Sequence, residues 1–225
     1  MKDKLLKSFS LALALSLFAF TSTNTSAEEV TSTTSVEFSE NKDITTPLDP
    51  LDPSIPGGEG GTGMGGPLSL DFVPTMNFGT HTLSSGISTF NALNLKPYIQ
   101  VSDTRGTGTG WSVKASLSDF MDTATKTKKL DGAILSFYNS NVFASTPTNS
   151  SNTPTGFNFD LSAGGSTQTI LHAQAGEGMG TWLQTWLADS QSDASNSNAT
   201  LTLDTSSAFA QAYDGTITWS IELAP

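Results

Sequence analysis

The sequence contains no cysteine, so no disulfide can hold the fold together and a bacterial lipid anchor has no residue to attach to. Histidine is almost as scarce, with only His81 and His172. No string has the spacing of a nucleophile elbow, a zinc-protease motif or a P-loop. Because catalysis needs a constellation of reactive groups, we predict no enzyme activity, no cofactor and no metal site.

Basic residues are also few. The chain of 225 residues has 10 Lys and Arg against 21 Asp and Glu, a formal charge of -11. Without residues 1–27 the balance is 7 against 20, or -13. Nucleic acids and anionic lipids are bound through basic residues, so neither is an expected partner.

Long apolar runs are missing except at the start. "MKDKLLK" carries three lysines, "FSLALALSLFAF" is an apolar run of about 12 residues, and small residues lead to Ala27. This pattern predicts a secretory signal peptide at residues 1–27, too short for a membrane span of about 20 residues. With no later span or anchor signal, we expect a secreted protein that stays at a cell surface by binding.

Residues 28–66 hold eight acids, one lysine and the string "TTPLDPLDPSIPGGEGGTGMGG". Prolines favour extended backbone and glycines favour flexible coil, so we predict a disordered or semi-extended spacer. Asp49 and Asp52 are hard oxygen ligands, but a calcium site needs six or more oxygens in a closing loop. The spacer is therefore the favoured interpretation.

Short runs rich in Val, Ile, Thr and aromatic residues alternate with turn residues from Pro67 to Pro225, and helical periodicity is nearly absent. This spacing predicts one all-β domain at residues 67–225, an antiparallel β-sandwich. In "GTWLQTWLADS", a strand would place Trp182 and Trp186 on one face, whereas a helix would cluster both with the leucines. We favour the strand.

Two strings show strict alternation, "WSVKASL" from Trp111 and "ITWSIEL" from Ile217. Each places its tryptophan on the packed face of a strand. A packed tryptophan is either a large core contributor or a platform for a ligand. The sequence leaves both roles open for Trp111 and Trp219.

Other candidates for chemistry have simpler explanations. Gly106, Gly108 and Gly110 in "RGTGTG" precede a strand, whereas phosphate-binding loops precede helices, so they predict a turn. The acid pairs Asp119 with Asp122, and Asp189 with Asp193, could serve glycoside hydrolysis. They lie in Ser/Thr-rich loops, where Asp caps turns.

Several strings resemble, in order, the WxL domain of surface proteins from low-GC Gram-positive bacteria. They are "DPLDPSIPGGEGGTGMGGPLSLDFVPTMNFG", "VSDTRGTGTGWSV", "LDGAILSF", "GEGMGTW" and "YDGTITWSIELAP", covering about Asp49 to Pro225. The signature tryptophans correspond to Trp111 and Trp219. The third motif position is Val113 or Ile221 in place of leucine, which keeps an apolar residue there. Trp182 matches an aromatic position before the last strands.

The resemblance implies a secreted protein held non-covalently on the cell wall, with this domain taking part in peptidoglycan attachment. It also implies a surface complex with a membrane-anchored WxL-interacting partner. A protein-interaction subunit that docks on that partner, or an adhesin for host matrix, are the alternatives.

Three further residues receive roles. Asp103 and Arg105 flank the glycine turn, and we predict a charge-assisted hydrogen bond between them or to loop backbone. Tyr213 precedes Trp219 by six residues and is predicted to anchor its corner through its hydroxyl, as in other sandwiches. We expect the Trp111 and Trp219 strands to be neighbours, with the glycine turn beside them.

Overall fold

The computed structural model describes residues 29–57 and 60–224, so the predicted signal peptide lies outside the described residues. Residues 29–37 belong to a separate N-terminal unit, form no secondary structure and are all exposed. The β structure lies in the second unit, which begins at residue 38. Throughout its described part the chain has no helix capable of crossing a membrane.

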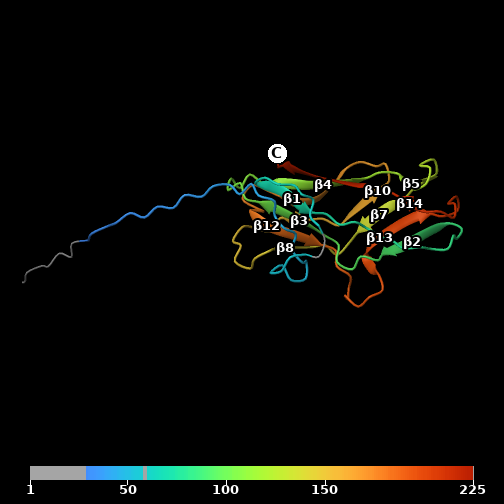
Figure 1. Ribbon diagram of the computed structural model, residues 1–225, viewed down its shortest axis with the longest axis horizontal. Coiled ribbons are helices and arrows are strands. Elements are labelled where there is room, and N and C mark those ends of the chain that lie inside the picture. Colours follow the sequence, from blue (N-terminus) through green and yellow to red (C-terminus); the bar gives the residue numbers. More distant parts are fainter. Residues whose placement is uncertain (1–28, 58–59, 225) are drawn as a thin grey trace, which may run out of the picture. The chain divides into compact units, whose positions relative to one another are not determined.

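The described residues form fifteen strands in four antiparallel sheets, which confirms the all-β prediction (Figure 1). In spatial order, sheet 1 contains β1 (Leu68–Phe72), β3 (Tyr98–Asp103), β12 (Gly180–Thr185) and β8 (Asn141–Ala144). Sheet 2 contains β10 (Phe159–Ser162), β7 (Ile134–Phe137), β13 (Asn196–Asp204) and β2 (Ile87–Ala92). Sheet 3 contains β15 (Ile217–Leu223), β4 (Trp111–Leu117), β11 (Gln168–Ala173) and β9 (Thr155–Gly156). Sheet 4 contains β14 (Tyr213–Asp214), β5 (Phe120–Asp122) and β6 (Lys129–Leu130).

One hydrophobic core joins the first three sheets. Val101 of sheet 1, Phe137 of sheet 2 and Val113 of sheet 3 belong to the same buried cluster. Each lies on a strand whose apolar residues alternate with polar ones or form a continuous buried run. A shared interior of this kind is what a β-sandwich without disulfides needs for its stability.

Sheet 1 is covered on both faces, which explains the two apolar faces of "GTWLQTWLADS". Trp182 packs into the main core, whereas Leu183 packs in a second cluster with Phe72 and Tyr98. Residues 180–185 of the segment form the strand β12, as predicted, and Trp186 directly after it packs in the core against Phe137.

The second face of sheet 1 is covered by residues 41–57 and 60–66, which we call the strap. The backbone N–H of Leu48 donates to Gln100 Oε1 at 2.8 Å, and Gln100 Nε2 donates to the Thr46 carbonyl at 3.2 Å. Farther along, the Thr62 N–H donates to the carbonyl of Asp71 at 2.9 Å. This part of the predicted spacer is therefore attached to the domain, and it turns back on itself where the Gly57 N–H donates to the Pro47 carbonyl at 2.8 Å.

A carboxylate is buried close to the strap. Asp71 accepts hydrogen bonds from Ser69 Oγ at 2.5 Å, Ser102 Oγ at 2.7 Å and Gln100 Nε2 at 3.0 Å. Burial raises the pKa of the Asp71 carboxyl although all three donors favour the charged form. The polar face of sheet 1 is thus part of the interior.

Candidate functional site

The two signature strings form one antiparallel ladder. In the β4–β15 pair, Trp111 is opposite Leu223, and Trp219 is opposite Ala115. Because directly opposite residues share a face, both indoles lie on the same side of sheet 3. They are four positions apart along the ladder, roughly 13 Å at about 3.4 Å per residue. The predicted pairing of the two strands is confirmed.

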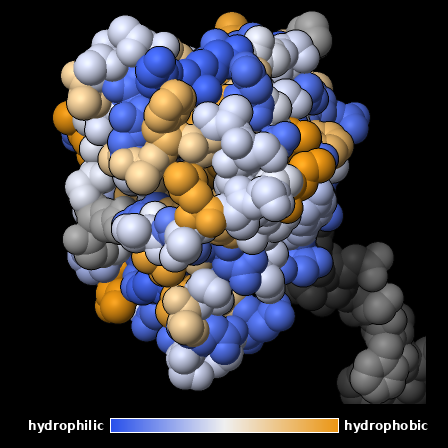
Figure 2. Space-filling view, turned by 90° about the vertical axis from the view of Figure 1, so that its right-hand side faces the viewer, coloured by the Kyte–Doolittle hydropathy of each residue, from blue (hydrophilic) through white to orange (hydrophobic). Residues whose placement is uncertain are grey.

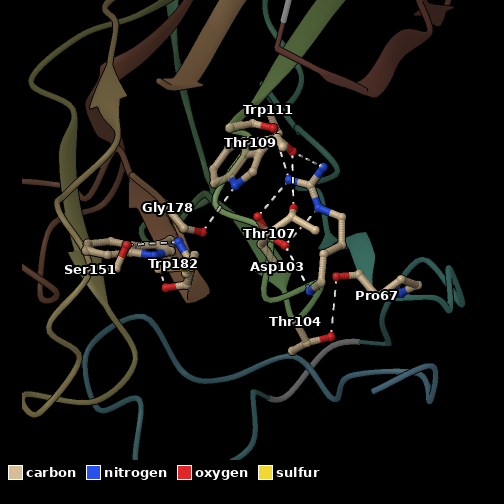
Figure 3. Close-up of polar contacts among 12 residues, drawn as sticks. Pro67, Asp103, Thr104, Thr107, Thr109, Trp111, Ser151, Gly178 and Trp182 are labelled. Atoms are coloured by element: carbon tan, nitrogen blue, oxygen red, sulfur yellow. Dashed lines mark hydrogen bonds and ion pairs between the residues drawn. The ribbon is translucent and has the colours of Figure 1, made fainter. Parts of the chain in front are cut away.

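Trp111 is a core residue. Its side chain is 0 % exposed, and Nε1 donates to the carbonyl of Gly178 at 3.1 Å (Figure 3). Gly178 has a φ of 72°, and a Cβ there would lie 2.8 Å from Trp111 Nε1. Only glycine can therefore close this loop over the indole. Trp182 donates to Met179 in the same loop at 3.0 Å.

The glycine turn is fixed by the predicted ion pair. Arg105 donates through Nη2 and Nε to the two oxygens of Asp103, at 2.7 and 2.9 Å (Figure 3). The side chains are 10 % and 0 % exposed, respectively, and the bond to Asp103 raises the pKa of Arg105. Arg105 Nη2 also donates to the Gly110 carbonyl at 2.9 Å. The pair therefore holds the turn directly before Trp111.

All three glycines of the turn have positive φ, between 60° and 75°. Gly110 has the least room, since a Cβ there would lie 2.4 Å from the Ala173 carbonyl oxygen. The turn thus packs its backbone against the end of β11. This close backbone contact and the positive φ values account for glycine at these positions.

Trp219 has a different environment. It is half-buried on β15, the edge strand of sheet 3, and its nearest aromatic partner is Phe159, edge-on at a centroid distance of 6.4 Å. Among the residues that the structure describes, none accepts a hydrogen bond from Trp219 Nε1. The indole lines an open cavity of about 1070 Å³.

We call this cavity the Trp219 groove. Its floor consists of core side chains from several sheets, and its rim consists of the segments 73–83 and 205–217. The floor and wall side chains include Phe90, Leu117, Phe120, Leu135, Leu201 and Ile217. Figure 2 looks onto this end of the domain, where apolar side chains interrupt a hydrophilic surface. A groove of this size and lining suits a ligand with apolar or ring-shaped groups.

Two polar anchors order the rim. The Tyr213 hydroxyl accepts hydrogen bonds from the Phe209 N–H at 3.1 Å and from Gln211 Nε2 at 3.2 Å. Lys128 Nζ lies 4.9 Å from the centroid of the Phe209 ring. Tyr213 therefore bonds to upstream backbone, as predicted, and does so beside the groove.

The backbone of β15 presents a second binding feature. The Thr216 carbonyl accepts from the Ser118 N–H, and the Ala224 N–H donates to the Gly110 carbonyl, so these two residues face β4. The alternate residues Ile217, Trp219 and Ile221 therefore direct their N–H and C=O groups to the free edge. In the described part of the chain, no strand pairs with this edge. An added strand would find these groups ready to bond.

The remaining candidates are separated from the groove or already occupied. Val113 is fully buried, whereas Ile221 is half-buried on the same ladder. Asp122 accepts bonds from the backbone of Thr127 and Lys128, and donors of its own loop hold the pKa of its carboxyl well below the usual range. Asp119 forms an ion pair with Lys129.

The other predicted acids and histidines also have local partners. Asp189 accepts from Asn198, and Asp193 accepts from the Ser190 N–H. His172 Nδ1 lies 2.8 Å from Ser112 Oγ. No group of three or more His, Asp or Glu side chains suited to a metal occurs in residues 29–57 and 60–224.

Comparisons with known proteins point the same way as the resemblance. A model of the WxL family, described as "WxL domain surface cell wall-binding", matches residues 25–225. A search of curated proteins and a search of solved structures each find no match.

Proposed function

Because the chain belongs to the WxL family of surface cell-wall-binding domains, we propose that its β domain binds peptidoglycan directly and is thereby held on the wall without a covalent link. That the protein is associated with the cell wall at the cell surface follows from the family itself. The Trp219 groove is the contact that we assign to the wall polymer, either glycan or stem peptide.

The half-buried Trp219 is the observation that supports this assignment. A tryptophan in a sandwich core normally has its ring covered, as Trp111 and Trp186 do. Trp219 shares the motif and the sheet face of Trp111 but keeps an unbonded Nε1 at the wall of a groove. A ligand that covers the indole would gain both apolar contact and a hydrogen bond.

The test is retention on isolated peptidoglycan with no other protein present. We expect wild type to sediment with the polymer and Trp219→Ala to bind about tenfold less, the loss of about 1.4 kcal/mol. Phe38→Ala is the matched control, because Phe38 is an exposed aromatic residue that does not line the groove. Wild-type protein that stays in the supernatant would refute the proposal.

The same assay tests the absence of enzyme activity. We expect no soluble sugar or peptide to be released from the polymer during incubation. Release that persists at a constant rate would identify a hydrolase and would direct attention back to Asp119 and Asp122.

Docking on a surface partner is the second candidate function, and the free edge of β15 favours it. A partner strand could pair with the edge and place alternate side chains in the Trp219 groove. Replacing Ile221 by proline would leave the groove side chains in place but remove an edge N–H. If Ile221→Pro remains folded, keeps peptidoglycan binding and loses a membrane-anchored partner, docking is a separate activity of this edge.

A further inference from the structure

A second and smaller cavity lies away from the signature strands. It has a volume of about 440 Å³ and lies between the edge strand β10 of sheet 2 and the first residues of β11 in sheet 3. Its lining consists of Tyr138, Phe157, Asn158, Phe159, Asp160, Gln168 and Thr169. We call it the seam pocket.

Two aromatic rings open onto the seam pocket. Tyr138 is 42 % exposed and Phe157 is 40 % exposed, although both belong to well-bonded segments. The Tyr138 hydroxyl donates to Asp160 at 2.8 Å, which fixes the direction of its ring. The backbone N–H of Tyr138 donates to the Asn198 carbonyl, and that of Phe157 donates to the Ile170 carbonyl. The rings are thus ordered before any ligand arrives.

Polar groups surround the rings, and several of their donors and acceptors remain free to form hydrogen bonds. Asp160 uses one carboxylate oxygen for Tyr138, and Asn158 uses its carbonyl oxygen for the Ser140 N–H. Within the described residues, the second Asp160 oxygen, Asn158 Nδ2 and the Thr169 hydroxyl have no protein partner. Donors and acceptors of both kinds are therefore available at one place.

The charge of the pocket restricts the ligand. Asp160 is the one charged residue among those that the structure places in the lining, and none is Lys or Arg. Phosphate or carboxylate groups would meet repulsion there, because no cation compensates them. Ordered rings with a carboxylate and amides suit a neutral molecule that has one C–H face and a rim of hydroxyl groups.

We propose that the seam pocket binds one neutral pyranose ring of a glycan chain. The sugar face packs on Tyr138 or Phe157, since the negative face of an aromatic ring attracts polarised C–H groups. Asp160 and Asn158 bond to its hydroxyl or acetamido groups. The biological use of this site, as a second contact with the wall, rests on the proposed function, whereas the binding itself does not.

The probe for the test is chitohexaose, a soluble and neutral hexamer of N-acetylglucosamine, titrated into the full chain by calorimetry. We expect wild type to bind with a Kd of about 1 mM or tighter. Tyr138→Ala and Phe157→Ala should each weaken binding at least about tenfold, and Asp160→Asn should weaken it less. Phe38→Ala is the matched control, because this exposed ring lines neither the seam pocket nor the Trp219 groove; it should bind as wild type does.

Melting temperatures show whether each variant is folded, and having two ring variants keeps the test decisive if one is not. No binding by wild type, or equal weakening by Phe38→Ala, would overturn the assignment. Wild type that sediments with peptidoglycan but ignores chitohexaose would overturn this inference alone. Chitohexaose binding without retention on peptidoglycan would overturn the proposed function and leave the pocket assigned.

Discussion

The two ends of the β4–β15 ladder differ, although the strings that form them are nearly the same. At one end, Trp111 is covered by the loop at Gly178 and braced by the Arg105 turn. At the other end, Trp219 is only half-buried and lines the groove. The alternation of apolar and polar residues determines, at both ends, that the segment is a strand and that the tryptophan lies on its packed face. The loops that pack against each end decide whether the indole is core or surface.

The largest expected effect comes from the covered end. Trp111→Ala would empty a fully buried site and should lower the free energy of unfolding by about 3–5 kcal/mol, whereas Trp219→Ala should cost about 1–2 kcal/mol. Urea unfolding of both variants measures the difference. Trp111→Phe, which keeps part of the ring volume, should fall between wild type and Trp111→Ala. Equal losses at 111 and 219 would remove the distinction between the ends.

Arg105→Ala tests the brace of the covered end. It would leave the buried Asp103 carboxylate without its cation, and we expect a loss of about 3 kcal/mol. Adding Asp103→Asn should recover part of that loss, because the uncompensated charge is then gone. If Arg105→Ala changed neither thermal stability nor wall retention, the brace would have no role.

A smaller effect is expected beside the open end, where Asp122 organises the loop that follows β5. The pKa of Asp122 is lowered, chiefly by the Lys128 N–H, so its contribution to stability is present above about pH 4 and is lost as the pH falls further. Asp122→Asn should therefore lower the Tm at pH 7, and the difference from wild type should shrink below pH 4. Differential scanning calorimetry across this range is the measurement. A difference independent of pH would contradict the charge-based explanation.

The smallest expected effect is that of Tyr213→Phe at the rim of the groove. Its hydroxyl accepts two hydrogen bonds from partly exposed donors, so the loss should be at most about 1 kcal/mol, or roughly 2–4 °C in Tm. The readout that sharpens the comparison is wall retention, which should fall if the rim shapes the groove. Phe38→Ala provides the control, because this exposed aromatic residue lies outside both the groove and the seam pocket.

Much of this arrangement follows from local sequence. Alternation predicts the faces of Trp111 and Trp219, and the shared motif predicts that their strands are neighbours. The Asp103–Arg105 pair is also predictable, since two residues that flank a tight turn are close in any fold. These features depend on contacts within a strand, a turn or one strand pair.

The groove and the seam pocket have no such signal. The groove is formed where the segments 73–83 and 205–217 meet, and nothing in either string states that they are neighbours. Tyr138 and Phe157 read as ordinary residues at strand ends until sheets 2 and 3 bring them together. Gly178 is one of several glycines in "GEGMGTW", and nothing in that string predicts that the Trp111 indole packs where its Cβ would be.

Sheet 1 shows why local alternation can mislead. Alternation along β1 would direct Asp71 to solvent, but an irregularity between Leu70 and Phe72 brings Phe72 to the face of Gln100. That face is then covered by a segment whose proline and glycine content resembles a free linker. Composition alone does not show that Leu48 is anchored there.

The strap therefore changes where the protein can be cut. The composition changes at Pro67, from a segment rich in proline and glycine to strand-forming residues. On sequence alone, Pro67 is therefore the natural first residue for a shortened chain. A chain that begins there would expose Gln100, Asp71 and the apolar side chains that Leu48 covers. We expect such an exposed apolar surface to cause aggregation. Proteases should instead remove residues 29–37 and stop before Asn41, whose carbonyl is bonded to Thr104. We therefore expect the smallest stable fragment of this protein to begin near Asn41, about 27 residues before β1.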